Sequence, residues 1–305
     1  MRTRLLMLIA VVGLVSSVTA AAADAVAPAD TPPPTPEVLV FAQRLKLEAR
    51  ITNFVYGITV LQNYEAVARW QSPVCPQVTG LARQPGEFVL ERVSEIARLA
   101  GAPLAKENCR PNLFIFVTSQ PEELLQAMEK RYFAVSFGNA APSQVDAFVN
   151  TPRPVRVWHS PYWTPEGASP QGYGVPPSAQ VLGGGLSSPP TYSTPGAMGA
   201  SRLINPGSWT FGNVYVIVDQ RQLRGVSQGQ FADYIAMVSL ADIKPSAHPG
   251  DAHSILTLFA DNPQAAPAAM SDWDQAFLKS LYATSPQRTQ PRSLISRGMM
   301  NELVH

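Results

Sequence analysis

Residues 213–240 read NVYVIVDQRQLRGVSQGQFADYIAMVSL, and this run decides the fold. Its first part, 213–219, is dominated by β-branched and aromatic residues, which predicts a buried strand. Residues 228–240 are predicted to form a helix from the spacing of their apolar side chains. Ser227 precedes this helix and Gln230 follows three residues later, the arrangement of a capping box. A strand that leads into a helix indicates a domain that mixes both elements.

The same two patterns recur along the chain. Strands are predicted over residues 53–61, 67–71, 112–118 and 153–158. Helices are predicted over 37–50, 88–99, 122–132, 142–149, 271–282 and 294–304, and the pair Ser271 and Asp274 caps the helix that begins at 271. Because strands and helices alternate irregularly, we expect one α+β domain with a mixed sheet over residues 37–285, followed by a C-terminal tail helix within 286–305.

Residues 160–208 interrupt this domain with a different composition. They contain nine Pro, nine Gly and eight Ser among 49 residues, and only Glu166 and Arg202 are charged. Such a segment cannot bury a hydrophobic core, so we expect a long disordered insertion. Its aromatic residues could stack on glycans or protein partners.

The N-terminus has the tripartite order of a secretory signal peptide. Arg2 and Arg4 precede an apolar run over residues 5–15, and small residues follow to Ala23. The apolar run is too short to span a bilayer, so we expect cleavage between residues 20 and 23 and no membrane span in the mature protein. The Pro-rich residues 24–36 are expected to form an extended tether.

Charge and cysteine content fit a protein that is exported to the periplasm or secreted. Without Arg2 and Arg4, 21 basic residues face 22 acidic ones, so nothing recruits nucleic acid. The two cysteines, Cys75 and Cys109, are an even number in an exported chain, and we predict that they form a disulfide. Two buried free thiols are the alternative.

Two stretches could carry chemistry, although neither identifies a catalytic residue outright. Residues 225–229, GVSQG, match the GxSxG pattern of hydrolase nucleophiles, with Ser227 as nucleophile and His248, His253 or His305 as its base. Polar residues 220–224 separate this pattern from the strand, so the capping role of Ser227 is favoured. His248 and His253 flank Asp251 in a loop that could hold a metal, but their spacing favours a solvated turn. We expect no metal and no cofactor.

The order of segments from 219 to 282 resembles the second half of a zincin metallopeptidase. In zincins the motif HExxHxxGL lies on a helix, SIM forms a turn, and LTxxD opens a last helix that ends in ALY. Here residues 231–240 read FADYIAMVSL, 254–256 read SIL, 270–274 read MSDWD, and the last helix ends at Tyr282. The alignment places Asp233 at the general base and Ala232 and Ala236 at the two histidine ligands. Alanine cannot bind zinc, so a conventional site is excluded.

The chain also resembles a bacterial family of uncharacterised exported proteins with a degenerate zincin-like domain. The residues that carry this resemblance are 51–57 (ITNFVYG), Arg69-Trp70, Ser72-Pro73 and 111–113 (PNL). It implies a non-catalytic protein of the periplasm or cell envelope that binds an envelope protein or a cell-wall component. A metal-independent hydrolase that uses Ser227 is the alternative, and a structural envelope protein is a third hypothesis.

Overall fold

The computed structural model describes residues 36–62, 66–138, 140–165, 207–260, 266–283 and 290–304. The predicted signal peptide, tether residues 24–35 and insertion residues 166–206 lie outside these described residues. The chain divides into an N-terminal unit that ends at Phe41 and a compact unit that begins at Ala42. The sheet and the helical residues that cover it, from residue 42 onward, belong to the compact unit.

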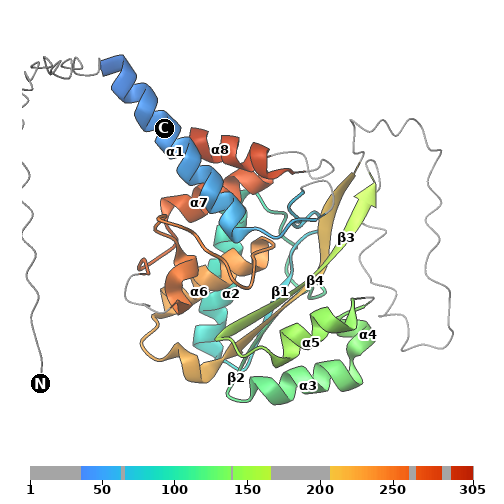
Figure 1. Cartoon of the computed structure of the whole chain (residues 1–305). Helices are drawn as coiled ribbons and strands as arrows, with labels where there is room; N and C mark the ends of the chain where they lie inside the picture. The colour runs from blue at the N-terminus through green and yellow to red at the C-terminus, as the bar shows by residue number, and fades with distance from the viewer. Residues whose placement is uncertain are drawn as a thin grey trace, which may run out of the picture. The chain divides into compact units, whose positions relative to one another are not determined.

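A four-stranded mixed sheet in the order β1-β2-β4-β3 forms the centre of the compact unit (Figure 1). Its strands are β1 (Pro76–Thr79), β2 (Leu113–Thr118), β3 (Val155–Pro165) and β4 (Gly207–Asp219). The strands β1, β2 and β4 run parallel, whereas β3 runs antiparallel to β4 at the edge. This mixed sheet confirms the α+β class and the strands predicted near 112–118, 153–158 and 213–219.

Two strands extend further than predicted. In the β3–β4 ladder, Trp163 pairs with Trp209 and Thr164 with Ser208, so both ends of the predicted insertion are strand. The boundaries predicted for the disordered insertion, 160 and 208, were therefore wrong. The Pro and Gly content near these residues does not indicate a strand, because the strand pairing there depends on a partner far away in sequence. The short β1 was not predicted because it begins with Pro76, but the first residue of a strand tolerates a missing N–H group.

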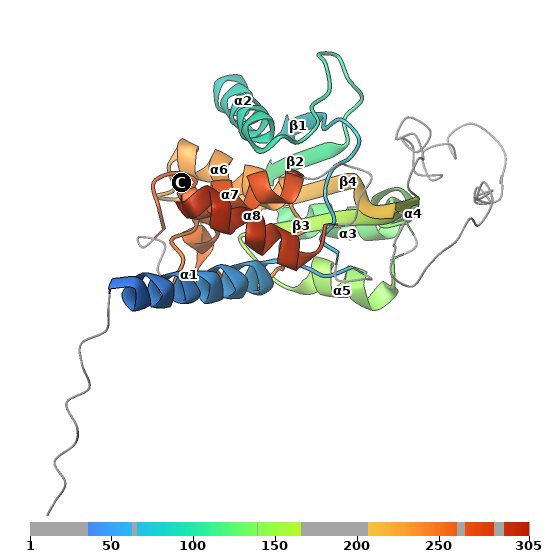
Figure 2. The same ribbon diagram turned by 90° about the horizontal axis from the view of Figure 1, so that it is seen from above.

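Helices cover both faces of the sheet and bury two hydrophobic clusters. The larger cluster receives residues from α1 (Pro36–Ile58), α2 (Arg83–Ala100), α6 (Gln228–Leu240), α7 (Asp272–Tyr282) and α8 (Arg292–Val304). The smaller cluster lies under α3 (Pro121–Arg131), α4 (Phe133–Ser136) and α5 (Pro142–Asn150). Two short 3-10 helices, η4 (Gln220–Leu223) and η5 (Ile255–Phe259), flank α6 in sequence. Figure 2 shows α2 and α6 on one side of the strands.

Alternation along the strands divides side chains between the two clusters. In β2 and β4 the residues Leu113, Ile115, Val214 and Val216 belong to the larger cluster. Their neighbours Phe114, Phe116, Tyr215 and Ile217 belong to or pack on the smaller one. Successive side chains of a strand point to opposite faces, so the near-continuous apolar sequence of these strands reflects burial on both sides.

Residues 53–61 are not a strand, contrary to prediction, because α1 continues as one helix to Ile58. Ile51, Phe54, Val55 and Ile58 are almost fully buried, and their spacings of three, one and three residues place them on one helical face. Their β-branched and aromatic character is typical of a strand. Packing of this face on the core stabilises the helix, because tertiary contacts override the intrinsic strand propensity of these residues.

The predicted strand over 67–71 is also absent. This segment forms only isolated bridges: Arg69 pairs with both Thr210 and Ala241, and the nearby Ala66 pairs with Pro291. Its backbone therefore links several elements instead of following one neighbour. Such a segment shows the composition of a strand without the continuous ladder of one.

Two further features stabilise the domain. The disulfide between Cys75 and Cys109 is confirmed, with Cα atoms 6.0 Å apart, and it lies just before β1 and β2. The Asn112 side chain holds the same corner, accepting from the Cys75 N–H and donating to the Pro73 carbonyl. The C-terminal helix α8 is not a tail: its Ile295 and Met299 are fully buried in the larger cluster.

We predict that Phe54→Ala lowers the free energy of unfolding by about 3 to 5 kcal/mol, because it leaves a cavity in the core. The Phe54 ring meets Trp273 and Phe277 edge to face, at centroid distances of 5.5 and 6.1 Å. Phe41→Ala on the same helix is the control; its side chain is exposed, and the change should stay within about 0.5 kcal/mol. Denaturant unfolding followed by circular dichroism measures both, and equal effects would contradict the burial of the α1 face.

Candidate functional site

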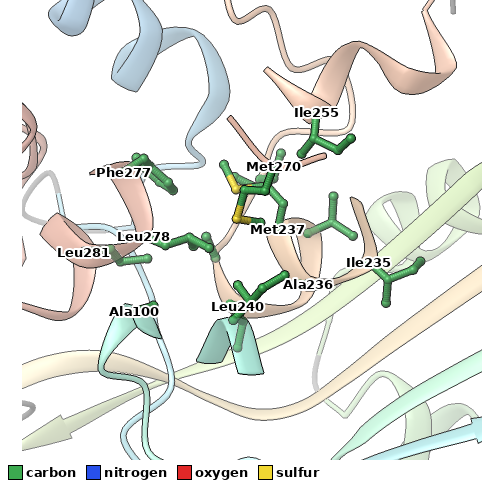
Figure 3. Packing of buried hydrophobic residues seen from close by; sticks show 14 of the residues in the cluster. Ala100, Ile235, Ala236, Met237, Leu240, Ile255, Met270, Phe277, Leu278 and Leu281 are labelled. Carbon is green, nitrogen blue, oxygen red and sulfur yellow. The ribbon is translucent and has the colours of Figure 1, made fainter. Parts of the chain in front are cut away.

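The helix α6, which the zincin resemblance assigns to the metal site, is buried on almost all sides. Both Ala232 and Ala236 have no exposed surface. Figure 3 shows Ala236, Met237 and Leu240 among apolar side chains from other elements, including Met270, Phe277, Leu278 and Leu281. The two positions that would carry histidine ligands are thus filled by the methyl groups of a close-packed core.

Asp233, the position of the general base, is tied to its neighbours by hydrogen bonds. Its Oδ1 accepts from Arg92 Nε at 2.5 Å, and its Oδ2 accepts from Arg92 Nη2 at 3.1 Å and from the Met270 N–H at 2.6 Å. The side chain is 1 % exposed. The hydrogen bond that Arg92 donates to Asp233 raises the pKa of Arg92. This carboxylate therefore links α2, α6 and the start of α7, and it is buried away from solvent.

Ser227 is the N-cap of α6, which confirms the capping box. Its hydroxyl accepts from the Gln230 N–H at 3.2 Å, and the Gln230 side chain accepts from the Ser227 N–H at 3.2 Å. The 3-10 helix η4 lies between β4 and this serine, so the strand does not lead directly into a nucleophile turn. Within the described part of the chain, no hydrogen bond joins Ser227 to a histidine.

The loop with His248 and His253 is held by other contacts. Asp251 pairs with Arg50 Nε at 2.8 Å, and the His248 N–H donates to the Gly57 carbonyl. Both histidine side chains are exposed. Among the described residues, no three His, Cys, Asp or Glu side chains lie close enough together to hold a metal ion. His305 lies outside the described residues.

A buried histidine that the sequence patterns do not indicate lies at the C-terminal end of α6, opposite the end that Ser227 caps. The side chain of His159, from β3, is 6 % exposed, and its Nδ1 is 3.4 Å from Asp242 Oδ1. Gln62 Nε2 donates to the other oxygen of Asp242 at 2.9 Å. Burial lowers the pKa of His159 and raises the pKa of Asp242, and each charge opposes the shift of its partner.

These groups satisfy the C-terminal carbonyls of α6. His159 Nε2 lies 2.9 Å from the Val238 carbonyl, Trp70 Nε1 donates to the Ser239 carbonyl at 2.8 Å, and the Tyr282 hydroxyl donates to the Leu240 carbonyl at 2.5 Å. Burial raises the pKa of the Tyr282 hydroxyl, so it stays a donor. The last carbonyls of a helix lack partners within the helix, so a buried end needs such donors. No local pattern around residue 159 signals this contact, because the partner lies about 80 residues away.

No family model, curated protein or solved structure matches this chain. The class that the geometry itself defines is an α+β domain whose central helix is enclosed by packing, with buried polar groups that serve as caps and ties. Of the predicted candidates, Ser227 caps α6 and Asp233 lies on it, whereas His248 and His253 lie on a loop held by α1. The structure does not bring the four into one constellation.

We predict that Asp233→Ala lowers the free energy of unfolding by about 3 kcal/mol, because it leaves Arg92 and the Met270 N–H without their acceptor. Combining it with Arg92→Ala should cost less than the sum of the single changes, as expected for one ion pair. Asp272→Ala, at an exposed position in the first turn of α7, is the control. Urea unfolding gives all four values. Additive losses, or a variant more stable than the parent, would argue against the structural tie.

The pair of His159 and Asp242 predicts a pH-dependent effect of Asp242→Asn. Without the carboxylate, only hydrogen bonds to backbone groups oppose the burial that lowers the pKa of His159 below its ordinary 6.5. As the pH falls below 6.5, His159 then binds a proton in the unfolded chain but not in the folded protein. The folded state of the variant therefore loses stability as the pH falls. The deficit of the variant should grow between pH 7.5 and pH 5, by at most about 1.4 kcal/mol per pH unit.

Urea midpoints of parent and variant at the two pH values measure this effect. The exposed Asp251→Asn is the control, and its difference from the parent should be the same at both. A deficit of Asp242→Asn that does not change with pH would refute the coupling to His159.

Proposed function

We propose that the chain is a non-catalytic, zincin-like protein that acts outside the cytoplasm, in the periplasm or cell envelope, by binding an envelope protein or a cell-wall component. The observation that carries this proposal is the environment of α6. Its two ligand positions are fully buried alanines, and the carboxylate at the position of the base is engaged by Arg92 and Met270. These features support a zincin-like domain that lacks the zinc ligands and the free general base needed for zinc-dependent hydrolysis.

The order of elements supports the zincin-like part of the proposal. Strand β4 leads to α6, Ser254 then caps η5, and Ser271 caps α7 with Asp274 in a capping box. Asp274 also accepts from the Ser254 hydroxyl and the Ile255 N–H, which joins η5 to the start of α7. This is the strand, helix, turn and helix order on which the sequence resemblance rests.

The edge of the sheet offers a surface on which binding could occur. Among the described residues, no strand other than β4 pairs with β3, so β3 forms one edge of the sheet. Such an edge can accept an extended segment of another chain through main-chain hydrogen bonds. This geometry favours a protein or a peptide-containing wall component as the partner.

One observation supports export. The disulfide between Cys75 and Cys109 belongs to a compartment where thiols oxidise. None of the helices in the described ranges has the length and apolar character needed to cross a bilayer.

The proposal predicts far less than one zinc per purified chain and no peptidase activity above that of a sample carrying Asp233→Asn. Elemental analysis and hydrolysis of a quenched protein substrate measure these two quantities. An affinity pull-down from envelope extracts, with the disulfide intact, should then recover a saturable partner. One tightly bound zinc per chain together with peptidase activity would refute the non-catalytic role. Labelling by a fluorophosphonate probe that Ser227→Ala abolishes would favour the hydrolase instead.

A further inference from the structure

Arg156, on β3, is a buried cation with an unused hydrogen-bond donor. Its side chain is 3 % exposed, its Nε donates to the Thr151 carbonyl at 2.9 Å, and its Nη2 reaches Glu122 at 3.4 Å. Its Nη1 is buried without an acceptor among the described residues. Buried donors in folded proteins nearly always have an acceptor, so this group points to a bound one.

A second unused donor lies on the same face of β3. The buried Nε1 of Trp158 also lacks an acceptor in the described part of the chain. Arg156 and Trp158 are two residues apart and pair with Ile217 and Tyr215, both of which belong to the smaller cluster. Two unused donors on one face favour a ligand that accepts hydrogen bonds.

The topology of the sheet places Arg156 where open sheets commonly bind ligands. At the carboxyl ends of the neighbouring parallel strands β2 and β4, Thr118 pairs with Asp219. From there β2 leads to α3 over the smaller cluster, whereas β4 leads to α6 in the larger one. Adjacent strands whose following helices lie on opposite faces define a switch point, at which open sheets bind ligands.

At this switch point the guanidinium groups of Arg156 and Arg221 are balanced by the carboxylates of Asp219 and Glu122. Asp219 is neutralised by Arg221, which donates to both carboxylate oxygens at 2.8 Å. Glu122 is held loosely: it is half exposed and lies 3.4 Å from both Arg156 Nη2 and Arg221 Nη2. Glu122 is also in the first turn of α3, whose N-cap, Gln120, makes no capping hydrogen bond with its side chain. An uncapped helix N-terminus attracts anions.

We propose that the carboxyl ends of β2 and β4 form a binding site for a small oxyanion, a carboxylate or a phosphate group. The oxyanion displaces the Glu122 side chain, accepts hydrogen bonds from Arg156 and Arg221, and lies at the N-terminus of α3. This site is separate from α6 and goes beyond the proposed binding function.

The test titrates the purified full-length protein with inorganic phosphate and, separately, with acetate. Thermal unfolding and tryptophan fluorescence are recorded at constant ionic strength, with chloride as the replaced ion. Saturable stabilisation is expected with at least one of the two anions. Response to phosphate alone assigns the site to phosphate groups, and response to both assigns it to oxyanions in general.

Two variants separate a binding site from a structural ion pair. Glu122→Gln removes the competing carboxylate and should tighten anion binding about threefold to tenfold. Arg156→Gln should abolish binding, and if that variant does not fold, Glu122→Gln still decides. The matched control is Glu87→Gln, at an exposed carboxylate that pairs with Arg83 on α2; it should leave binding unchanged. No saturable effect of either anion, or equal effects of Glu122→Gln and Glu87→Gln, would overturn the proposal.

Discussion

The fold depends on satisfying the C-terminal end of a helix that is buried in the core. Three donors converge on the last carbonyls of α6: His159 from the edge strand β3, Trp70 from the segment that links several elements, and Tyr282 from the end of α7. These residues are far apart in sequence, so their contacts require that β3, α7 and the linking segment are all in place. The hydrogen bonds to the last carbonyls of α6 thereby couple the edge of the sheet to the C-terminal half of the chain.

The ends of two other helices are stabilised in the same way by buried arginines. Arg69 donates to the Leu281 carbonyl in the last turn of α7, and burial lowers its pKa to about 10. Arg292 donates to the carbonyl and hydroxyl of Thr59 just after α1, and its guanidinium lies over the Tyr56 ring. Cations are favourable at the negative end of a helix dipole. The burial of these arginines is therefore explained by backbone carbonyls that need donors, which agrees with a structural role for this polar region.

The sequence predicts those parts of the fold whose signals are local. The strands near 112–118 and 213–219 are continuous apolar runs, and both capping boxes lie within four residues of chain, so pattern and geometry agree. The disulfide followed from the number of cysteines. The strands predicted over residues 53–61 and 67–71 were wrong, because packing partners far away in sequence determine the secondary structure of these segments. For the candidate site, the capping role of Ser227 was predictable, but the ties of Asp233 and His159 were not, since Arg92 and Asp242 lie 141 and 83 residues from them.

The disulfide between Cys75 and Cys109 has a consequence for the order in which the chain assembles. Parallel neighbours such as β1 and β2 meet only after the intervening loop has closed, and the entropy of loop closure is spent before their contacts form. A covalent link across 34 residues, placed at the beginning of both strands, removes most of that search. The chain with this disulfide formed should therefore nucleate its sheet more readily than the chain with both thiols reduced.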